Sequence, residues 1–135
     1  MGINKKLVAL LSSGVALHSS GINNWAFKKN QALLVLDEIR KINVPILGGD
    51  VFLFEDELLV PASENWFCDQ LNKETYDEYV LRSINVAKSY IEKMQLNGRV
   101  PYFVLVPESD FAVETDEILN ELKEQWKKNR GHHTN

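Results

Sequence analysis

The sequence predicts an α+β fold in which a small, mainly antiparallel sheet is covered by about four helices. Two kinds of pattern predict it. Apolar residues recur every three or four positions over residues 28–42 and 75–94, which is the spacing of amphipathic helices. Short apolar runs at residues 46–54 and 102–106 lack this period and are bounded by turn residues, as buried strands are. The order helix, helix, hairpin, helix, strand, helix indicates an α+β domain.

The first part of the chain predicts two helices joined by a loop. Residues 4–13 form a short amphipathic helix, and residues 15–24 are rich in Ser, Gly and Asn, which favour a loop. The second helix covers residues 28–42. Pro45 ends it, because a proline cannot continue a helix and disfavours helical geometry in the residue before it.

A hairpin near residues 46–60 follows. The apolar run 46–54 is its first strand, Glu55-Asp56-Glu57 its charged turn, and residues 58–60 its return. Pro61 indicates that the second strand either ends there or lies at an edge of the sheet, because proline cannot donate to a strand ladder.

The last elements are a long helix, a strand and a final helix. Thr75 and Glu78 have the spacing of a capping box, and Asn97-Gly98 predicts the stop of the long helix. The strand at 102–106 lies between two prolines and is expected to be buried on both faces. A final helix is predicted from Thr115, with acidic residues in its first turn.

Composition limits the class of protein. The 135 residues suffice for a single domain, 1–135, with a polar tail from about residue 130. A fraction of 44% apolar and 25% charged residues is typical of a globular protein, and the chain lacks an apolar run long enough to cross a membrane. Ser12, Ser13 and Gly14 interrupt the N-terminal apolar stretch, which favours a short helix over a secretion signal.

Charge and cysteine content exclude further classes. The formal net charge is −4, whereas proteins that hold nucleic acid are usually basic. The single cysteine, Cys68, cannot form an internal disulfide, and no zinc-ligand spacing is present. We therefore expect a cytoplasmic protein without metal or cofactor that contacts neither nucleic acid nor membrane.

Acidic residues are concentrated in the middle of the chain. Residues 50–78 carry nine acidic side chains and one basic one, and more follow the last predicted strand at Glu108, Asp110 and Glu114. If these loops meet at one end of the sheet, they form a negative patch suited to a basic partner. The alternative is ordinary solvated loop charge. The candidate binding residues in the first segment are Asp50, Glu55, Asp56, Glu57, Glu64 and Asp69.

Catalytic motifs are missing from the sequence. It contains no G-x-S-x-G elbow, no phosphate-binding loop and no H-E-x-x-H pair, and two of its three histidines lie near the C-terminus. Cys68 follows Trp66-Phe67, a setting that favours a buried, inert thiol. An enzyme is therefore not expected.

The most unusual local feature is Gly48-Gly49-Asp50 inside an apolar strand. Glycines weaken a strand, so they indicate a bulge or close approach by a backbone or an aromatic ring. The favoured interpretation is a bulge over which Trp25 or Trp66 packs. The alternative is that Asp50 is presented at a kink as a carboxylate for a ligand.

Several segments resemble one family. The resemblance covers about residues 14–107 and is to the bacterial polymorphic-toxin immunity proteins, specifically the immunity family numbered forty. Its most specific part is the Leu-Gly-Gly-Asp-Val block, and the two asparagine–tryptophan pairs add weight. The segments that carry it are Asn24-Trp25-Ala26, Ile46-Leu47-Gly48-Gly49-Asp50-Val51, Asn65-Trp66-Phe67-Cys68, Arg82-Ser83, Tyr90-Ile91 and Phe103-Val104-Leu105-Val106.

The resemblance implies a small cytoplasmic protein, made beside a toxin gene, that binds a toxin domain and blocks it. It implies no enzymatic activity and assigns no contact residues. If the toxin is a nuclease, its active site is basic, and carboxylates could occupy its phosphate positions. The hypothesis is that Asp50 and the hairpin residues Glu55, Asp56 and Glu57 contribute to the contact.

Two other functions remain open at the level of sequence. One is a general protein-interaction module that has no toxin partner. The other is a small-ligand binder or enzyme with a pocket near Gly48-Gly49-Asp50, walled by Trp25 and Trp66. A filled core beside the glycines would count against this second function.

Overall fold

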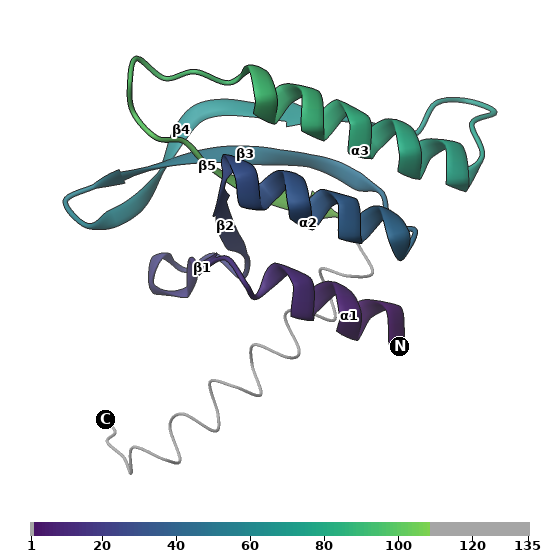
Figure 1. Ribbon diagram of the computed structural model, residues 1–135, viewed down its shortest axis with the longest axis horizontal. Helices are drawn as coiled ribbons and strands as arrows, with labels where there is room; N and C mark the ends of the chain where they lie inside the picture. The colour runs from purple at the N-terminus through teal and green to yellow at the C-terminus, as the bar shows by residue number, and fades with distance from the viewer. Residues whose placement is uncertain (1, 109–135) are drawn as a thin grey trace, which may run out of the picture.

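The computed structural model describes residues 2–108, which form a five-stranded antiparallel sheet and three α-helices. The strand order is β1-β2-β5-β3-β4, and α2 and α3 lie side by side along one face of the sheet (Figure 1). The predicted α+β class is confirmed. The helix predicted from residue 115 lies outside the described residues. The elements are α1 (Gly2–Leu11), β1 (Val15–Ala16), η1 (His18–Ser20), β2 (Trp25–Lys28), α2 (Lys29–Lys41), β3 (Ile46–Glu55), β4 (Leu58–Phe67), α3 (Tyr76–Lys93) and β5 (Tyr102–Pro107).

The long helix α3 begins as its sequence predicts. The Thr75 side chain accepts a hydrogen bond from the Glu78 amide, and the Glu78 carboxylate accepts one from the Thr75 amide, so the capping box is complete. Its predicted stop at Asn97-Gly98 is wrong. The helix ends at Lys93, and Asn97 and Gly98 instead form a separate tight turn, with φ of 50° and 82°.

Two strands lie in or beside the segment predicted as a loop. β1 has only two residues, and β2 has only four, so neither shows a readable alternation. β2 becomes a strand because it pairs with both β1 and β5. Asn24 reinforces this pairing: its side-chain amide donates to the Leu105 carbonyl at 2.8 Å, and its side-chain oxygen accepts from the Trp25 amide.

The hairpin is longer than its sequence predicts. β4 continues through Pro61 as far as Phe67, and in the described part of the chain it is the last strand of the sheet. The sequence left two alternatives for Pro61, the end of the strand or an edge of the sheet. The edge position is confirmed. The register between β3 and β4 shifts between Asp50 and Phe52, so β4 carries a bulge there.

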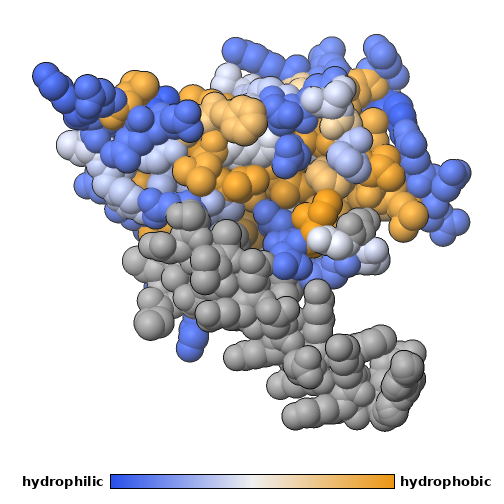
Figure 2. Space-filling view, turned by 180° about the vertical axis from the view of Figure 1, so that it is seen from behind, coloured by the Kyte–Doolittle hydropathy of each residue, from blue (hydrophilic) through white to orange (hydrophobic). Residues whose placement is uncertain are grey.

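The sheet has two unlike faces. Its covered face packs against α2 and α3 and holds the main core, including Phe27, Val51 and Phe103, each fully buried. The opposite face, which we call the open face, carries a smaller cluster in which Phe52 and Val104 pack with Leu17. Figure 2 views the molecule from the side opposite to that of Figure 1 and shows hydrophobic residues gathered over its middle. β5 is buried on both faces through Phe103, Val104 and Leu105, as expected.

Candidate functional site

The β3–β4 hairpin extends beyond the rest of the sheet. Phe52, opposite Tyr102, is the last β3 residue in register with β5, so residues 53–60 have strand partners only within the hairpin. These residues project from the body as a two-stranded arm (Figure 1). The arm (residues 53–60) is therefore open to a partner from several directions.

The turn at the end of the arm is strained and acidic. Asp56 and Glu57 have positive φ, 51° and 69°, the backbone of a two-residue hairpin turn that favours Asn-Gly or Asp-Gly. A non-glycine residue in this region costs about 1 kcal/mol. Both side chains are exposed, so the turn presents two carboxylates to solvent.

Arg99 holds the base of the arm. Its Nη2 donates to the Phe54 carbonyl at 2.9 Å, and its Nη1 lies 3.5 Å from a Glu55 carboxylate oxygen. Both side chains of this ion pair are about half exposed, so the pair adds little stability. This ion pair neutralises the charge of Glu55. Among the described residues of the tip, Asp56 and Glu57 remain as carboxylates without an ion pair.

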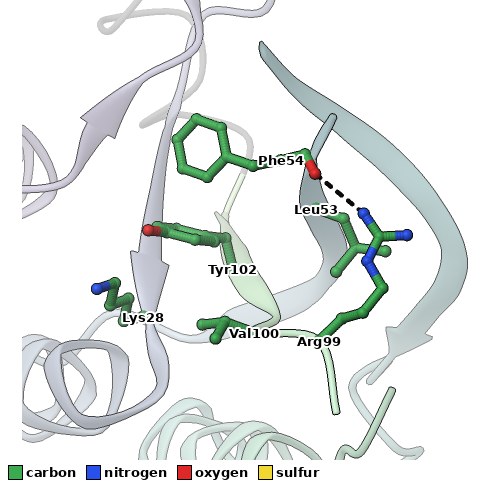
Figure 3. Close-up of a pocket in the computed structure, with 6 residues that line it drawn as sticks. All are labelled: Lys28, Leu53, Phe54, Arg99, Val100 and Tyr102. Atoms are coloured by element: carbon green, nitrogen blue, oxygen red, sulfur yellow. Dashed lines mark hydrogen bonds between the residues drawn. The ribbon is translucent and has the colours of Figure 1, made fainter. Parts of the chain in front are cut away.

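A surface pocket of about 320 Å³ lies beside Arg99 at the base of the arm (Figure 3). The rings of Phe54 and Tyr102 meet edge to face there, with their centroids 5.0 Å apart. The volume of this pocket is at the lower end of the range for small-ligand sites, and its lining contains no catalytic pair of side chains. Its lining residues are Lys28, Leu53, Phe54, Arg99, Val100 and Tyr102.

The acidic arm does not meet Glu108, the acidic residue that follows β5. β3 and β5 are antiparallel, and Ile46 pairs with Pro107, so the arm and the residue after β5, Glu108, lie at opposite ends of the sheet. The condition for a single negative patch is therefore not met. Asp110 and Glu114 lie outside the described residues.

The six candidate acidic residues lie in four places. Glu55, Asp56 and Glu57 are at the arm's tip, and Asp50 is exposed in the middle of β3. Asp69 follows the far end of β4, about 30 Å from the turn at 3.3 Å per strand residue.

Glu64 is half-buried in β4, in the neighbourhood of Tyr90. Burial, and to a smaller extent the charges of Glu64 and Asp50, raise the pKa of Tyr90. The structure therefore brings together only the three residues of the arm.

The glycine pair is packed against Trp66. A Cβ atom built on Gly49 would overlap the Trp66 ring, and one built on Gly48 would overlap the Trp66 carbonyl oxygen. The ring also stacks on Tyr90, with centroids 4.7 Å apart. A tryptophan thus packs over the glycines, as the favoured interpretation expected. The filled space counts against a ligand pocket between Trp25 and Trp66, both of which are buried.

Arg82 is a central structural residue that the sequence indicated only through the family resemblance. Its guanidinium forms a two-bond ion pair with Glu74, at 2.6 and 2.9 Å, and donates to the Asp69 carbonyl. These bonds hold the pKa of Glu74 at about 2. The guanidinium also lies 3.2 Å from the Cys68 sulfur. Burial raises the pKa of that thiol, which supports the expectation of an inert cysteine.

Ser83 joins α3 to the sheet. Its fully buried hydroxyl accepts a hydrogen bond from the Ile46 amide at 2.9 Å and donates to the Val80 carbonyl. The Arg82-Ser83 pair therefore fixes the two ends of the β3–β4 hairpin to α3: Ser83 at the start of β3, and Arg82 after β4.

Across residues 2–108, we find no group of three or more metal-ligating side chains, and no helix long and apolar enough to cross a membrane. The exposed features of the described residues include an acidic arm, a shallow pocket beside it and an open sheet face. These features belong to a small α+β domain.

Comparison with known proteins identifies the family. The model of the family Immunity protein 40 matches residues 16–107, about two thirds of the chain, so the chain belongs to this family of immunity proteins. The resemblance stated from the sequence is confirmed. Neither a curated protein nor a solved structure matched the chain.

Proposed function

We propose that the protein binds a cognate bacterial toxin domain in the cytoplasm of the producing cell and neutralises it by stoichiometric inhibition, without enzymatic activity. The observation that carries this proposal is the family match over residues 16–107, since the family is one of immunity proteins. The fold supports it, because the described residues offer projecting and exposed surfaces for a protein partner rather than an enclosed reaction site.

The arm supplies the first part of the proposed contact. Glu55, Asp56 and Glu57 project from the body, and Asp50 lies on the same β3 strand. Carboxylates placed this way suit a basic partner such as a nuclease toxin, whose phosphate-binding groups they would occupy. Electrostatic attraction would also speed capture of the free toxin. The proposed contact does not include the candidates Glu64 and Asp69, since Glu64 is half-buried and Asp69 lies at the other end of β4.

Co-expression tests the function directly. The toxin domain encoded beside this gene is induced in cells with and without the protein, and growth is recorded. The proposal expects growth to be restored and a complex of fixed stoichiometry to elute from a sizing column. A complex without rescue would favour a general interaction module. Neither rescue nor a complex at micromolar concentration would contradict the proposal.

A further inference from the structure

Two segments singled out in the sequence are neighbours in the sheet. Gly48, Gly49 and Asp50 of β3 lie opposite Phe67, Trp66 and Asn65 of β4, in that order, and the register is regular over these three pairs. On the other side of β3, Gly48 lies opposite Val106 and Asp50 opposite Val104 of β5. Both segments therefore form one strip across three strands.

The two faces of this strip have different roles. Val51 and Trp66 point toward the covered face, where they pack in the core, and the Trp66 ring lies against Gly49. The alternation of a strand places Asp50, Asn65, Phe67 and Val106 on the open face, and all four are exposed. Phe67, the last residue of β4, is 79% exposed, a high value for a phenylalanine. We call these four residues the sheet patch.

The sheet patch combines one ring, one carboxylate and one amide within reach of each other. Asp50 is directly opposite Asn65 and diagonal to Phe67, a spacing of about 7–8 Å that long or aromatic side chains bridge. Gly48 places no side chain between Phe67 and Val106. Among the described residues, Asp50 forms no ion pair, and the nearest basic residue in the pairing pattern, Lys28, lies two strands away beside Tyr102.

We propose that the sheet patch binds an arginine side chain presented by the toxin. A guanidinium matches all three groups: it pairs with a carboxylate through two hydrogen bonds, donates to an amide oxygen and stacks on an aromatic ring. A lysine ammonium has no plane to stack. This inference rests on the proposed function and adds to the arm a second contact on the same hairpin.

The size of a normal interface allows both contacts. Asp50 and Asp56 are six residues apart, about 20 Å along the strand. A standard interface covers about 800 Å² on each partner, which is wide enough to include both. A second copy of this chain is a poorer occupant, since a symmetric contact would place the two Asp50 carboxylates near each other.

Two truncations of the sheet patch test the proposal. With the inactivated toxin domain encoded beside this gene as the probe, Phe67→Ala is expected to raise Kd about 30-fold and Asp50→Asn about tenfold. Leu34→Ala and Glu92→Gln are matched controls, because both side chains are exposed on helices away from the open face; they should change Kd less than twofold. Melting temperatures of the free variants should equal that of the wild type.

A charge exchange identifies the arginine. Asp50→Arg should abolish growth rescue, and one Arg→Asp change in the toxin should restore it. Wild-type binding that neither variant of the sheet patch weakens would overturn this inference and leave the proposed function standing. Absence of any wild-type complex would overturn both.

Two further results would also overturn the inference. A lowered melting temperature of free Phe67→Ala would assign the sheet patch to the chain's own packing. Self-association of the wild type that Phe67→Ala abolishes would assign it to a second copy.

Discussion

At the scale of single residues, several side chains that carry the family resemblance hold the fold together. Asn24 joins β2 to β5, Trp66 fills the space beside Gly49, and Ser83 ties α3 to β3. The side chains of Asn24 and Ser83 are hydrogen-bonded at positions where an unpaired buried group would cost about 1–3 kcal/mol. Four residues of the same segments have no such packing role and are exposed on the open face: Asp50, Asn65, Phe67 and Val106.

Gly49 tests this packing. In Gly49→Ala the new Cβ atom meets both the Trp66 ring and the Val104 carbonyl oxygen, and the backbone atom cannot move aside cheaply. We expect the free energy of unfolding to fall by about 1–3 kcal/mol, the usual cost of overpacking. Chemical denaturation measures it, with Ser63→Ala on the exposed side of β4 as the control. An unchanged midpoint would show that Trp66 does not pack tightly over the strand.

Glu74 gives the protein a pH dependence in acid. Its pKa is about 2 in the folded protein, against an ordinary value of 4.5, because Arg82 and the Leu71 amide bind the charged form. A lowered pKa means that the stabilisation is complete above pH 4.5 and is lost as the pH falls toward 2. Glu74→Gln should therefore be less stable than wild type at pH 6, and the difference should shrink between pH 4.5 and 2.

Denaturation curves at a series of pH values measure this difference. Glu92→Gln, an exposed substitution on the same helix–loop unit, is the control and should follow the wild type at each pH. A constant gap between wild type and Glu74→Gln from pH 6 to 2 would contradict the assignment.

At the scale of elements, the arm joins a strained turn to a charged surface. Glu57 has a φ of 69°, where glycine is favoured, and the change Glu57→Gly creates the Asp-Gly pair typical of such turns. We expect the free energy of unfolding to rise by about 0.5 kcal/mol, while association with the toxin slows because a carboxylate is lost. A thermal melt and a stopped-flow measurement test the two effects. A less stable variant would refute the strain argument.

Local signals in the sequence predict the helices well and the sheet only in part. The period of α2 and the capping box of α3 depend on residues within a few positions of each other. β2 depends instead on pairing with β5, about 80 residues away, and β1 depends on pairing with β2. The few residues of these two strands carry no pattern of their own. The length of β4 depends on its edge position, which makes Pro61 acceptable in mid-strand.

In the candidate site too, local features can be predicted from the sequence, whereas features that depend on strand pairing cannot. The acidic residues of the turn were predicted, since a charged turn between two apolar strands is a local pattern. That Glu108 and the arm lie at opposite ends of the sheet follows from the antiparallel order of β3 and β5, which is a property of the whole sheet. The sheet patch depends on the pairing of residues 48–50 with 65–67, a register that neither segment reveals alone.

At the scale of the whole molecule, the distribution of charge matters more than the net charge of −4. Acidic groups lie at both ends of β4: the arm at one end, and Asp69 at the other. A basic toxin approaching from a distance responds to the field of the whole protein, whereas the bound complex responds to the groups in contact. Association rates can therefore show which end faces the toxin.

Charge reversal at the arm gives this measurement. Replacing Glu55, Asp56 and Glu57 with lysine adds six units of charge and makes the net charge +2. We expect the association rate constant at low salt to fall at least tenfold and its decrease with rising ionic strength to become weaker or reverse. The reversal Asp69→Lys at the other end of β4 should change the rate less than threefold. Equal effects per charge at the two ends would mean that the toxin senses only net charge, and an unchanged rate in the triple variant would remove the arm from the contact.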